Sequence, residues 1–258
     1  MNAIDPLPQD KSKAPAVDAA LDVLEVLIQS TYPLSLSEIA ERIGVPVASC
    51  HRIMGTLLRR ELVVRDLKRK KSYCVGAKLF RMASAAYLQQ PVVSLFHSIA
   101  DVLKNELHEA VHLSVLAGSQ VLVVANVSWP FSEVVSTHVG KSAILHEDAA
   151  GKAMMSMESA YVQKHYWEEF MAGGSADDVP AVTSLDDWMH ELSEIKRIGY
   201  ALMRSEPAQD VCVLAAPVLN RRGEPVAAMG VHFAAHKDAR RYVTPLIQAT
   251  WQLSSRLG

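Results

Sequence analysis

Residues 108–112 read His-Glu-Ala-Val-His, which is the HExxH pattern of zinc hydrolases. On a helix, the two histidines of this pattern share one face and bind zinc, while the glutamate activates a water molecule. Here the second histidine, His112, stands at the start of an alternating run that is typical of a strand. The motif therefore straddles a helix end and a strand, where its two imidazoles would not share a face. The extended form of the motif also fails, because Val115 and Gly118 occupy its glycine and third-histidine positions.

Other residues with chemical potential are more scattered. No tight ligand spacing links His138, His146, His232 and His236, so local hydrogen bonding is the simpler interpretation, and a metal-sensing group is the alternative. Cys212 has no identifiable base partner, and a free cysteine is more often a small buried apolar residue. Neither a GxGxxG motif nor a P-loop occurs. We expect no catalytic residue, no metal ligand and no cofactor.

The clearest chemical signal is a basic segment. Between Arg42 and Arg81 there are eleven Lys and Arg against two acidic residues, a net charge of +9, whereas the chain from Leu88 onward carries −6. Taken alone, such a run of charge is explained equally well by a solvent-exposed face and by a site for a polyanion. The positive segment nevertheless has the charge that suits a polyanionic partner, and the rest of the chain does not.

Short helices must position this basic segment. After a predicted disordered tail over residues 1–13, helical spacing of apolar residues predicts a first helix that Pro33 ends. Ser35 and Glu38 form the capping-box pattern of a second helix, which Gly44 ends. A third helix, reaching about Arg60, would bury a stripe made of Cys50, Ile53, Met54, Leu57 and Leu58.

The opposite face of the third helix is small and polar. A major groove about 12 Å wide admits such a helix, because no bulky apolar side chain blocks its approach to the base edges. The alternative, packing against another domain, would require an apolar face. The residues expected to contact DNA from this face are Ala48, Ser49, His51, Arg52 and Arg59, with Val47 beside them.

A basic wing follows the third helix. Two short strands, at residues 62–64 and 72–75, flank a loop that carries Lys68, Arg69, Lys70 and Lys71, which we expect to neutralise DNA phosphates. This arrangement predicts a winged helix-turn-helix. Candidate DNA contacts from elsewhere in it are Ser35, Ser37 and Tyr73.

The remaining chain reads as a linker helix and a second domain. The apolar side of the linker helix can pair with a second subunit or pack on its own domain. Beyond Pro91, helices alternate with strands near residues 111–115, 120–127, 133–138, 212–219 and 226–233, which predicts a mostly antiparallel sheet flanked by helices. The expected divisions are 1–13 (tail), 14–76 (winged helix-turn-helix), 77–90 (linker helix) and 91–258 (second domain).

Length and composition agree with a multidomain α/β (α+β) protein. The 258 residues are 50% apolar and 21% charged, which fits two folded domains. Three widely spaced cysteines offer no disulfide framework, and no segment resembles a membrane span or a signal peptide. These features predict a cytoplasmic protein.

The order and spacing of several runs resemble the IclR family of bacterial transcriptional regulators over about residues 15–258. In the first half these are residues 34–40, 44–46, 51–54 and 73–76; in the second half they are Gly140-Lys141, His146, residues 150–153, Gly199-Tyr200, Glu206 and residues 215–218. The resemblance implies a winged helix-turn-helix and a GAF-like effector-binding domain. It also implies a homodimer or a dimer of dimers that binds double-stranded DNA, as a rule at a pseudo-palindromic operator.

The resemblance also implies where an effector would bind. Carried over residue by residue, the family's pocket falls on Ala149, Ala150, Met203 or Arg204, Cys212 or Val213, Gly230 and His232, and Met229 is a further apolar neighbour. Arg204 and His232 depart from the family pattern. Together with backbone N–H groups at a helix start near Ala149, they favour a carboxylate, and thus a small organic acid as effector. The alternatives are that Arg204 faces solvent or pairs with Glu206, or that the domain is a GAF-like enzyme or a metal sensor.

Overall fold

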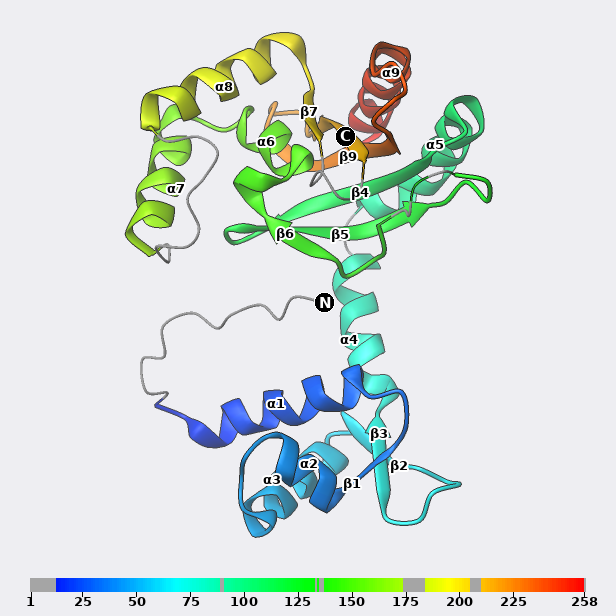
Figure 1. Ribbon diagram of the computed structural model, residues 1–258, viewed down its shortest axis with the longest axis vertical. Helices are drawn as coiled ribbons and strands as arrows, with labels where there is room; N and C mark the ends of the chain where they lie inside the picture. The colour runs from blue at the N-terminus through cyan, green and yellow to red at the C-terminus, as the bar shows by residue number, and fades with distance from the viewer. Residues whose placement is uncertain are drawn as a thin grey trace. The chain divides into compact units, whose positions relative to one another are not determined.

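The computed structural model describes residues 13–88, 91–132, 134, 137–173, 184–204 and 210–257. The chain forms two compact units, residues 1–86 and 87–258 (Figure 1). The division falls near the end of α4 (Ala77–Leu88), so most of this helix belongs to the first unit. Within the described residues, no helix has the length and the apolar content that crossing a bilayer requires. The predicted tail lies, apart from Lys13, outside the described residues.

The first unit is a helix-turn-helix with a small sheet. Ser35 caps α2 through the predicted capping box: its hydroxyl accepts the Glu38 backbone N–H, and its own backbone N–H donates to the Glu38 carboxylate. Gly44, at φ +67°, makes the turn that follows. The elements are α1 (Pro15–Gln29), β1 (Leu34–Ser35), α2 (Leu36–Arg42), α3 (Val47–Arg59), β2 (Val63–Arg65) and β3 (Ser72–Val75).

The core of this unit lies between the helices and the sheet. Helix α3 buries Cys50, Met54 and Leu57 and half-buries Ile53 and Leu58, which confirms the predicted stripe. Strand β3 pairs antiparallel with β2, as predicted, and also with β1. The two-residue strand β1 was not predicted, because a strand this short carries no periodicity. Through β1, the wing is joined by hydrogen bonds to the chain immediately before α2.

The second unit is built on a six-stranded sheet in the order β6-β5-β4-β9-β8-β7, in which all neighbours are antiparallel. This confirms the predicted architecture. The strands are β4 (Ala110–Ala117), β5 (Gln120–Val127), β6 (Ser142–Ile144), β7 (Ala201–Arg204), β8 (Val211–Leu219) and β9 (Pro225–Ala234).

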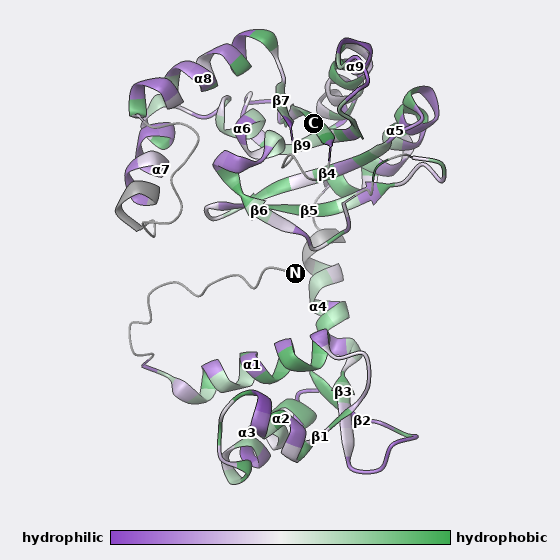
Figure 2. Cartoon of the chain, in the orientation of Figure 1, coloured by the Kyte–Doolittle hydropathy of each residue, from purple (hydrophilic) through white to green (hydrophobic). Residues whose placement is uncertain are grey.

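Helices cover both faces of this sheet (Figure 1). One face packs on α5 (Pro91–Leu107) and α9 (Arg240–Arg256), around a core that includes Phe96, Phe233 and Tyr242. The other packs on α6 (Ala149–Met155), behind which lie α7 (Ala160–Gly173) and α8 (Leu185–Ile198). Figure 2 shows apolar colour along the central strands, as expected for a sheet buried on both sides.

One predicted strand is not found. Thr137 and His138 are not in a strand, while residues 133, 135 and 136 of the same prediction lie outside the described residues. The edge strand is instead β6, which pairs with β5 immediately after the Gly140 turn. Three residues are again too few to show an alternating pattern.

The HExxH residues have separate structural positions. His108 follows the end of α5 with φ +59°, and His112 lies within β4, so the two imidazoles share no helix face, as predicted. The carboxylate of Glu109 is buried, and it accepts hydrogen bonds from Lys237 Nζ at 2.9 Å and from the Tyr242 hydroxyl at 3.0 Å. Glu109 therefore ties β4 to α9 and to the loop before it.

Candidate DNA-binding surface and effector cavity

The exposed face of α3 is cationic. Ala48, His51, Arg52 and Arg59 are exposed, Ser49 is half-buried, and the helix contains no acidic residue. Within the described part of the chain, Arg52 forms no ion pair, so its guanidinium is not bound to a carboxylate of its own domain. Arg59 donates to the Thr56 hydroxyl at 3.1 Å. The face thus presents one unengaged guanidinium at mid-helix among small side chains.

The other predicted DNA contacts from this unit differ in exposure. Ser37 and Val47 are exposed at the starts of α2 and α3. The Ser35 hydroxyl oxygen is used in the capping box, and Tyr73 is half-buried against the core. Ser35 and Tyr73 therefore have structural roles in addition to any contact with DNA.

The wing loop has a defined shape and three projecting lysines. One carboxylate oxygen of Asp66 accepts the backbone N–H groups of Lys68 and Arg69, which folds the loop into a tight turn. Lys68, Lys70 and Lys71 are exposed and form no ion pair with any described residue. Figure 2 shows this loop as hydrophilic over most of its length. A fixed loop with unpaired cations is suited to phosphate contacts.

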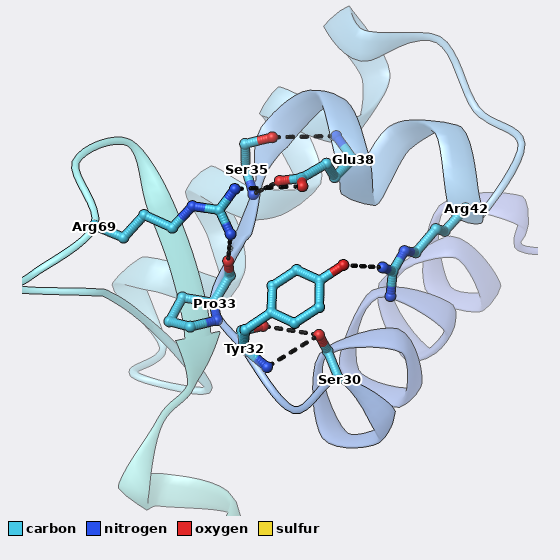
Figure 3. A network of polar contacts seen from close by, with 7 residues as sticks. All are labelled: Ser30, Tyr32, Pro33, Ser35, Glu38, Arg42 and Arg69. Carbon is cyan, nitrogen blue, oxygen red and sulfur yellow. Dashed lines mark hydrogen bonds and ion pairs between the residues drawn. The ribbon is translucent and has the colours of Figure 1, made fainter.

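Arg69 points back to the helix-turn-helix (Figure 3). Its guanidinium donates to the Pro33 carbonyl at 2.9 Å, lies 3.5 Å from a Glu38 carboxylate oxygen and sits 5.6 Å from the centre of the Tyr32 ring. On the other side of that ring, Arg42 donates to the Tyr32 hydroxyl at 3.0 Å. The side chain of Arg69 thus fastens the wing to the segment before α2, a role that the sequence did not predict, and its contact with a DNA phosphate stays a prediction.

The charge of Glu38 supports this fastening. Hydrogen bonds from Ser35 lower the pKa of the Glu38 carboxyl, and the neighbouring Arg69 and Arg42 lower it further. Glu38 is therefore an anion near neutral pH. It caps α2 and pairs with the wing through the same carboxylate.

A cavity of about 210 Å³ opens in the second unit between the α6 side of the sheet and the segment before α6. Its volume exceeds the roughly 150 Å³ that accommodates benzene in an engineered apolar cavity. Its lining residues are His112, Val121, Val123, Thr137, Lys141, Ser142, Ala143, Glu147, Asp148, Ala149, Met203, Arg204, Val211, Val213 and His232.

Five predicted effector residues line this cavity: Ala149, Met203, Arg204, Val213 and His232. The other four predicted residues do not line it. The side chains of Cys212 and Met229 pack in the core on the opposite face of the sheet, because they alternate with Val213 and Gly230 along their strands. Ala150 is buried within α6, and Gly230 lies beneath the imidazole of His112.

Arg204 and His232 are the two polar side chains expected to attract a carboxylate, and their surroundings alter the charge that each of them presents. Arg204 is two-thirds exposed and pairs with Asp210 at 2.8 Å, so it stands at the rim of the cavity with its charge partly neutralised. The sequence did not predict this pairing, and Glu206, the partner that it did suggest, lies outside the described residues. His232 is mostly buried, and burial together with the nearby Lys141 lowers its pKa to about 4, so its imidazole is neutral at pH 7.

The start of α6 is already occupied by a carboxylate. One Asp148 oxygen accepts the backbone N–H groups of Ala150 at 2.7 Å and Gly151 at 3.1 Å. Burial raises the pKa of Asp148, while these two hydrogen bonds and Lys141 oppose that rise. The expectation that the helix start near Ala149 binds a ligand anion is therefore wrong, because the helix supplies its own.

The scattered histidines do not converge. His146 contacts the Tyr166 hydroxyl at 3.2 Å, and His138 and His236 are exposed. In the described ranges, no three His, Cys, Asp or Glu side chains are grouped as metal ligands. Sequence reasoning did not place His112 or Lys141 in the cavity, and it considered His112 only as part of HExxH. The sequence showed that His112 shares one face of a strand with Ala110 and Ser114. It did not show that His112 pairs with Gly230 on the neighbouring strand.

Comparisons with known proteins agree on one family. The model for the C-terminal domain of the bacterial transcriptional regulator IclR matches residues 85–255, and the IclR helix-turn-helix model matches residues 16–67. An HTH-type transcriptional regulator of Mycobacterium tuberculosis is 30% identical over 76% of this chain and 74% of its own length. The transcriptional repressor IclR of Escherichia coli is 24% identical over 88% and 86%.

A solved structure shows the same fold. The crystal structure of an IclR homologue from Microbacterium hydrocarbonoxydans, in complex with 4-hydroxybenzoate, has a TM-score of 0.77 at 16% identity and covers 94% of this chain and 98% of that one. The two units therefore correspond to a DNA-binding helix-turn-helix domain and an effector-binding domain. The chain belongs to the IclR family of DNA-binding bacterial transcriptional regulators.

Proposed function

We propose that α3 and the wing bind an operator in double-stranded DNA, and that a small organic acid in the cavity controls this binding. The observation that carries the proposal is the acid-free, cationic face of α3 beside a wing with three unpaired lysines. Small side chains around Arg52 leave it room to reach a base edge, while the lysines suit the phosphates. We also propose that the protein acts in the cytoplasm as a homo-oligomer and that its operator is pseudo-palindromic.

The proposal of an organic acid rests on the mouth of the cavity. Lys141 lies there with its side chain exposed, and it forms no ion pair with any described residue. Valines and Met203 supply apolar walls for a hydrocarbon body. The structural relative from Microbacterium hydrocarbonoxydans is in complex with 4-hydroxybenzoate, which supports a small organic acid as the effector. We propose no catalytic activity, since the titratable groups of the cavity form no nucleophile-and-base pair in the described residues.

The base-reading role of Arg52 can be tested by in vitro selection. Full-length protein should enrich one motif from random double-stranded DNA, and Arg52→Ala should relax the preference at one base pair per half-site. A bidentate arginine contact to guanine contributes about 1–3 kcal/mol of discrimination, so the preference should fall by roughly 5- to 150-fold.

Arg60→Ala is the matched control, because Arg60 is an exposed arginine at the C-terminal cap of the same helix, about two turns beyond Arg52 and away from the N-terminal part that contacts base edges. It should remove the same charge without altering the selected motif. If Arg52→Ala retains the full motif with unchanged preferences, Arg52 does not read bases. If the wild-type protein enriches no motif, operator recognition itself is refuted.

A further inference from the structure

Two imidazoles form the inner, buried end of the cavity. His112 is 2% exposed, and the centre of its ring lies 4.7 Å from that of His232, with the rings at 63° to each other. His112 Nδ1 is fully buried and has no hydrogen-bond partner among the described residues. A buried polar nitrogen without a hydrogen-bond partner destabilises the native state, so a native site of this kind calls for a partner from outside the chain.

The sheet is shaped to seat this imidazole. Gly230 on β9 lies directly opposite His112 on β4, and a Cβ at Gly230 would lie only 2.2 Å from Cε1 and 2.5 Å from Nε2 of His112. A glycine in the middle of a buried strand gives up side-chain packing, and it commonly marks a close approach of another group. At Gly230 the approaching group is the His112 ring. This ring lies against the sheet in the space that an apolar side chain at position 230 would otherwise fill.

The charges of the cavity separate into two ends. Lys141, Glu147 and Arg204 are exposed at the mouth, whereas His112 is buried and His232 is half-buried. Burial lowers the pKa of both imidazoles. The pKa of His112 is lowered further by His232 and Lys141, and that of His232 by Lys141, so both imidazoles are neutral at pH 7. The remaining acid of the lining, Asp148, occupies the start of α6. A ligand carboxylate at the inner end would be desolvated beside two neutral imidazoles, while at the mouth it would meet Lys141.

Neutral imidazoles match a hydroxyl group. Each has one ring nitrogen that donates and one that accepts, and a hydroxyl both donates and accepts, whereas a carboxylate only accepts. We infer that the His112–His232 pair binds a hydroxyl group at the inner end of the effector, whose carboxylate faces Lys141. This inference rests on the proposed function and narrows the effector class to hydroxylated small organic acids.

The inference can be tested with matched acids that differ only in the hydroxyl. The probes are benzoate with 4-hydroxybenzoate, phenylacetate with 4-hydroxyphenylacetate, and butyrate with 4-hydroxybutyrate, each titrated into the full chain and followed by thermal shift and calorimetry. In at least one pair, the hydroxylated acid should bind at least about tenfold more tightly than its partner. Without the hydroxyl group, the imidazole nitrogens in the cavity stay unpaired.

Two substitutions at His232 separate hydrogen bonding from shape. His232→Met keeps a side chain of similar volume without hydrogen-bonding groups, and it should reduce the preference for the hydroxylated acid to threefold or less. His232→Gln retains a donor and an acceptor, so it should preserve most of the preference. Melting of the ligand-free variants shows whether each one folds, and loss of preference in both folded variants would contradict the assignment to a hydrogen bond.

Counting protons distinguishes the two orientations of the acid. A hydroxyl on the imidazoles leaves them neutral, so binding at pH 6.5 should take up almost no proton, as measured by calorimetry in buffers of different ionisation enthalpy. A carboxylate on the imidazoles would raise their pKa and take up as much as one proton, and affinity would rise as the pH falls. The groups that face the pair and could also respond are Lys141, Glu147, Asp148 and Arg204.

Each outcome decides between the inference and the proposed function. If both members of every pair bind equally and alter DNA binding, the regulator stands and the hydroxyl site is refuted, with water then serving the imidazoles. If proton uptake approaches one, the acid binds in the reverse orientation and the inference is again overturned. If none of the six acids binds, the organic acid effector and the hydroxyl site both fail, while the DNA-binding function is unaffected.

Discussion

Replacing Lys68, Lys70 and Lys71 together with alanine is expected to weaken DNA binding on the order of 10²-fold per protomer at about 0.15 M salt. Each lost phosphate contact lowers the slope of log K against log salt by about 0.9, so the three together should lower it by about 2.7. Because phosphate contacts carry no sequence information, binding to operator and to random DNA should fall alike. Fluorescence anisotropy over a salt series measures both quantities.

Arg69→Ala is the informative contrast, since it removes a neighbouring positive charge that the structure uses differently. Loss of its contacts with Pro33, Glu38 and Tyr32 should loosen the wing. Affinity should then decrease while the salt slope falls by less than for a single lysine. If Arg69→Ala instead lowers the slope by about 0.9, its guanidinium reaches a phosphate in the complex. If the triple-lysine variant loses operator binding alone, the phosphate assignment is refuted.

Acidification from pH 6.5 to pH 4 is expected to destabilise the effector domain, with about 3 kcal/mol attributable to His232. The ordinary pKa of histidine is about 6.5, and burial lowers that of His232 to about 4. Below pH 6.5 the unfolded chain therefore binds a proton that the native domain does not, and the stabilising contribution is lost as the pH falls. His112 acts in the same direction, because its pKa is lowered as well.

Urea unfolding followed by tryptophan fluorescence measures this effect, because all four tryptophans lie beyond residue 87 and so report on the effector domain. His232→Gln should flatten the decline in stability between pH 6.5 and pH 4, whereas His138→Gln, at an exposed position, should leave it unchanged. Identical pH profiles for wild type and His232→Gln would mean that His232 is not held neutral by burial.

Local patterns predicted the DNA-binding domain well because its determinants are close in sequence. The capping box of Ser35 and Glu38 spans three residues, and the buried stripe of α3 repeats with the helical period. The contacts of Arg69 within its own domain could not be predicted in this way. Its partners lie 31 to 37 residues away, and only the pairing of β3 with β1 brings them within reach.

The effector cavity was less predictable, because strand periodicity fixes alternation but not direction. Cys212 and Val213 necessarily face opposite sides of the sheet, yet only the packing of α6 on one face shows that Val213 lies in the cavity. His112 and Gly230 are far apart in sequence, and their register alone reveals why the glycine is needed. The occupied helix start depended on the rotamer of Asp148, which sequence does not specify.

Coupling between the two domains is tested most directly by the affinity of the full-length protein for its selected operator, measured with and without an acid that stabilises the effector domain in the thermal-shift assay. Saturating acid is expected to change the operator affinity by about fivefold or more, and operator DNA should change the affinity for the acid by the same factor, as linkage requires. An acid that binds the effector domain tightly while operator affinity stays the same would contradict the claim that the two sites form one regulator.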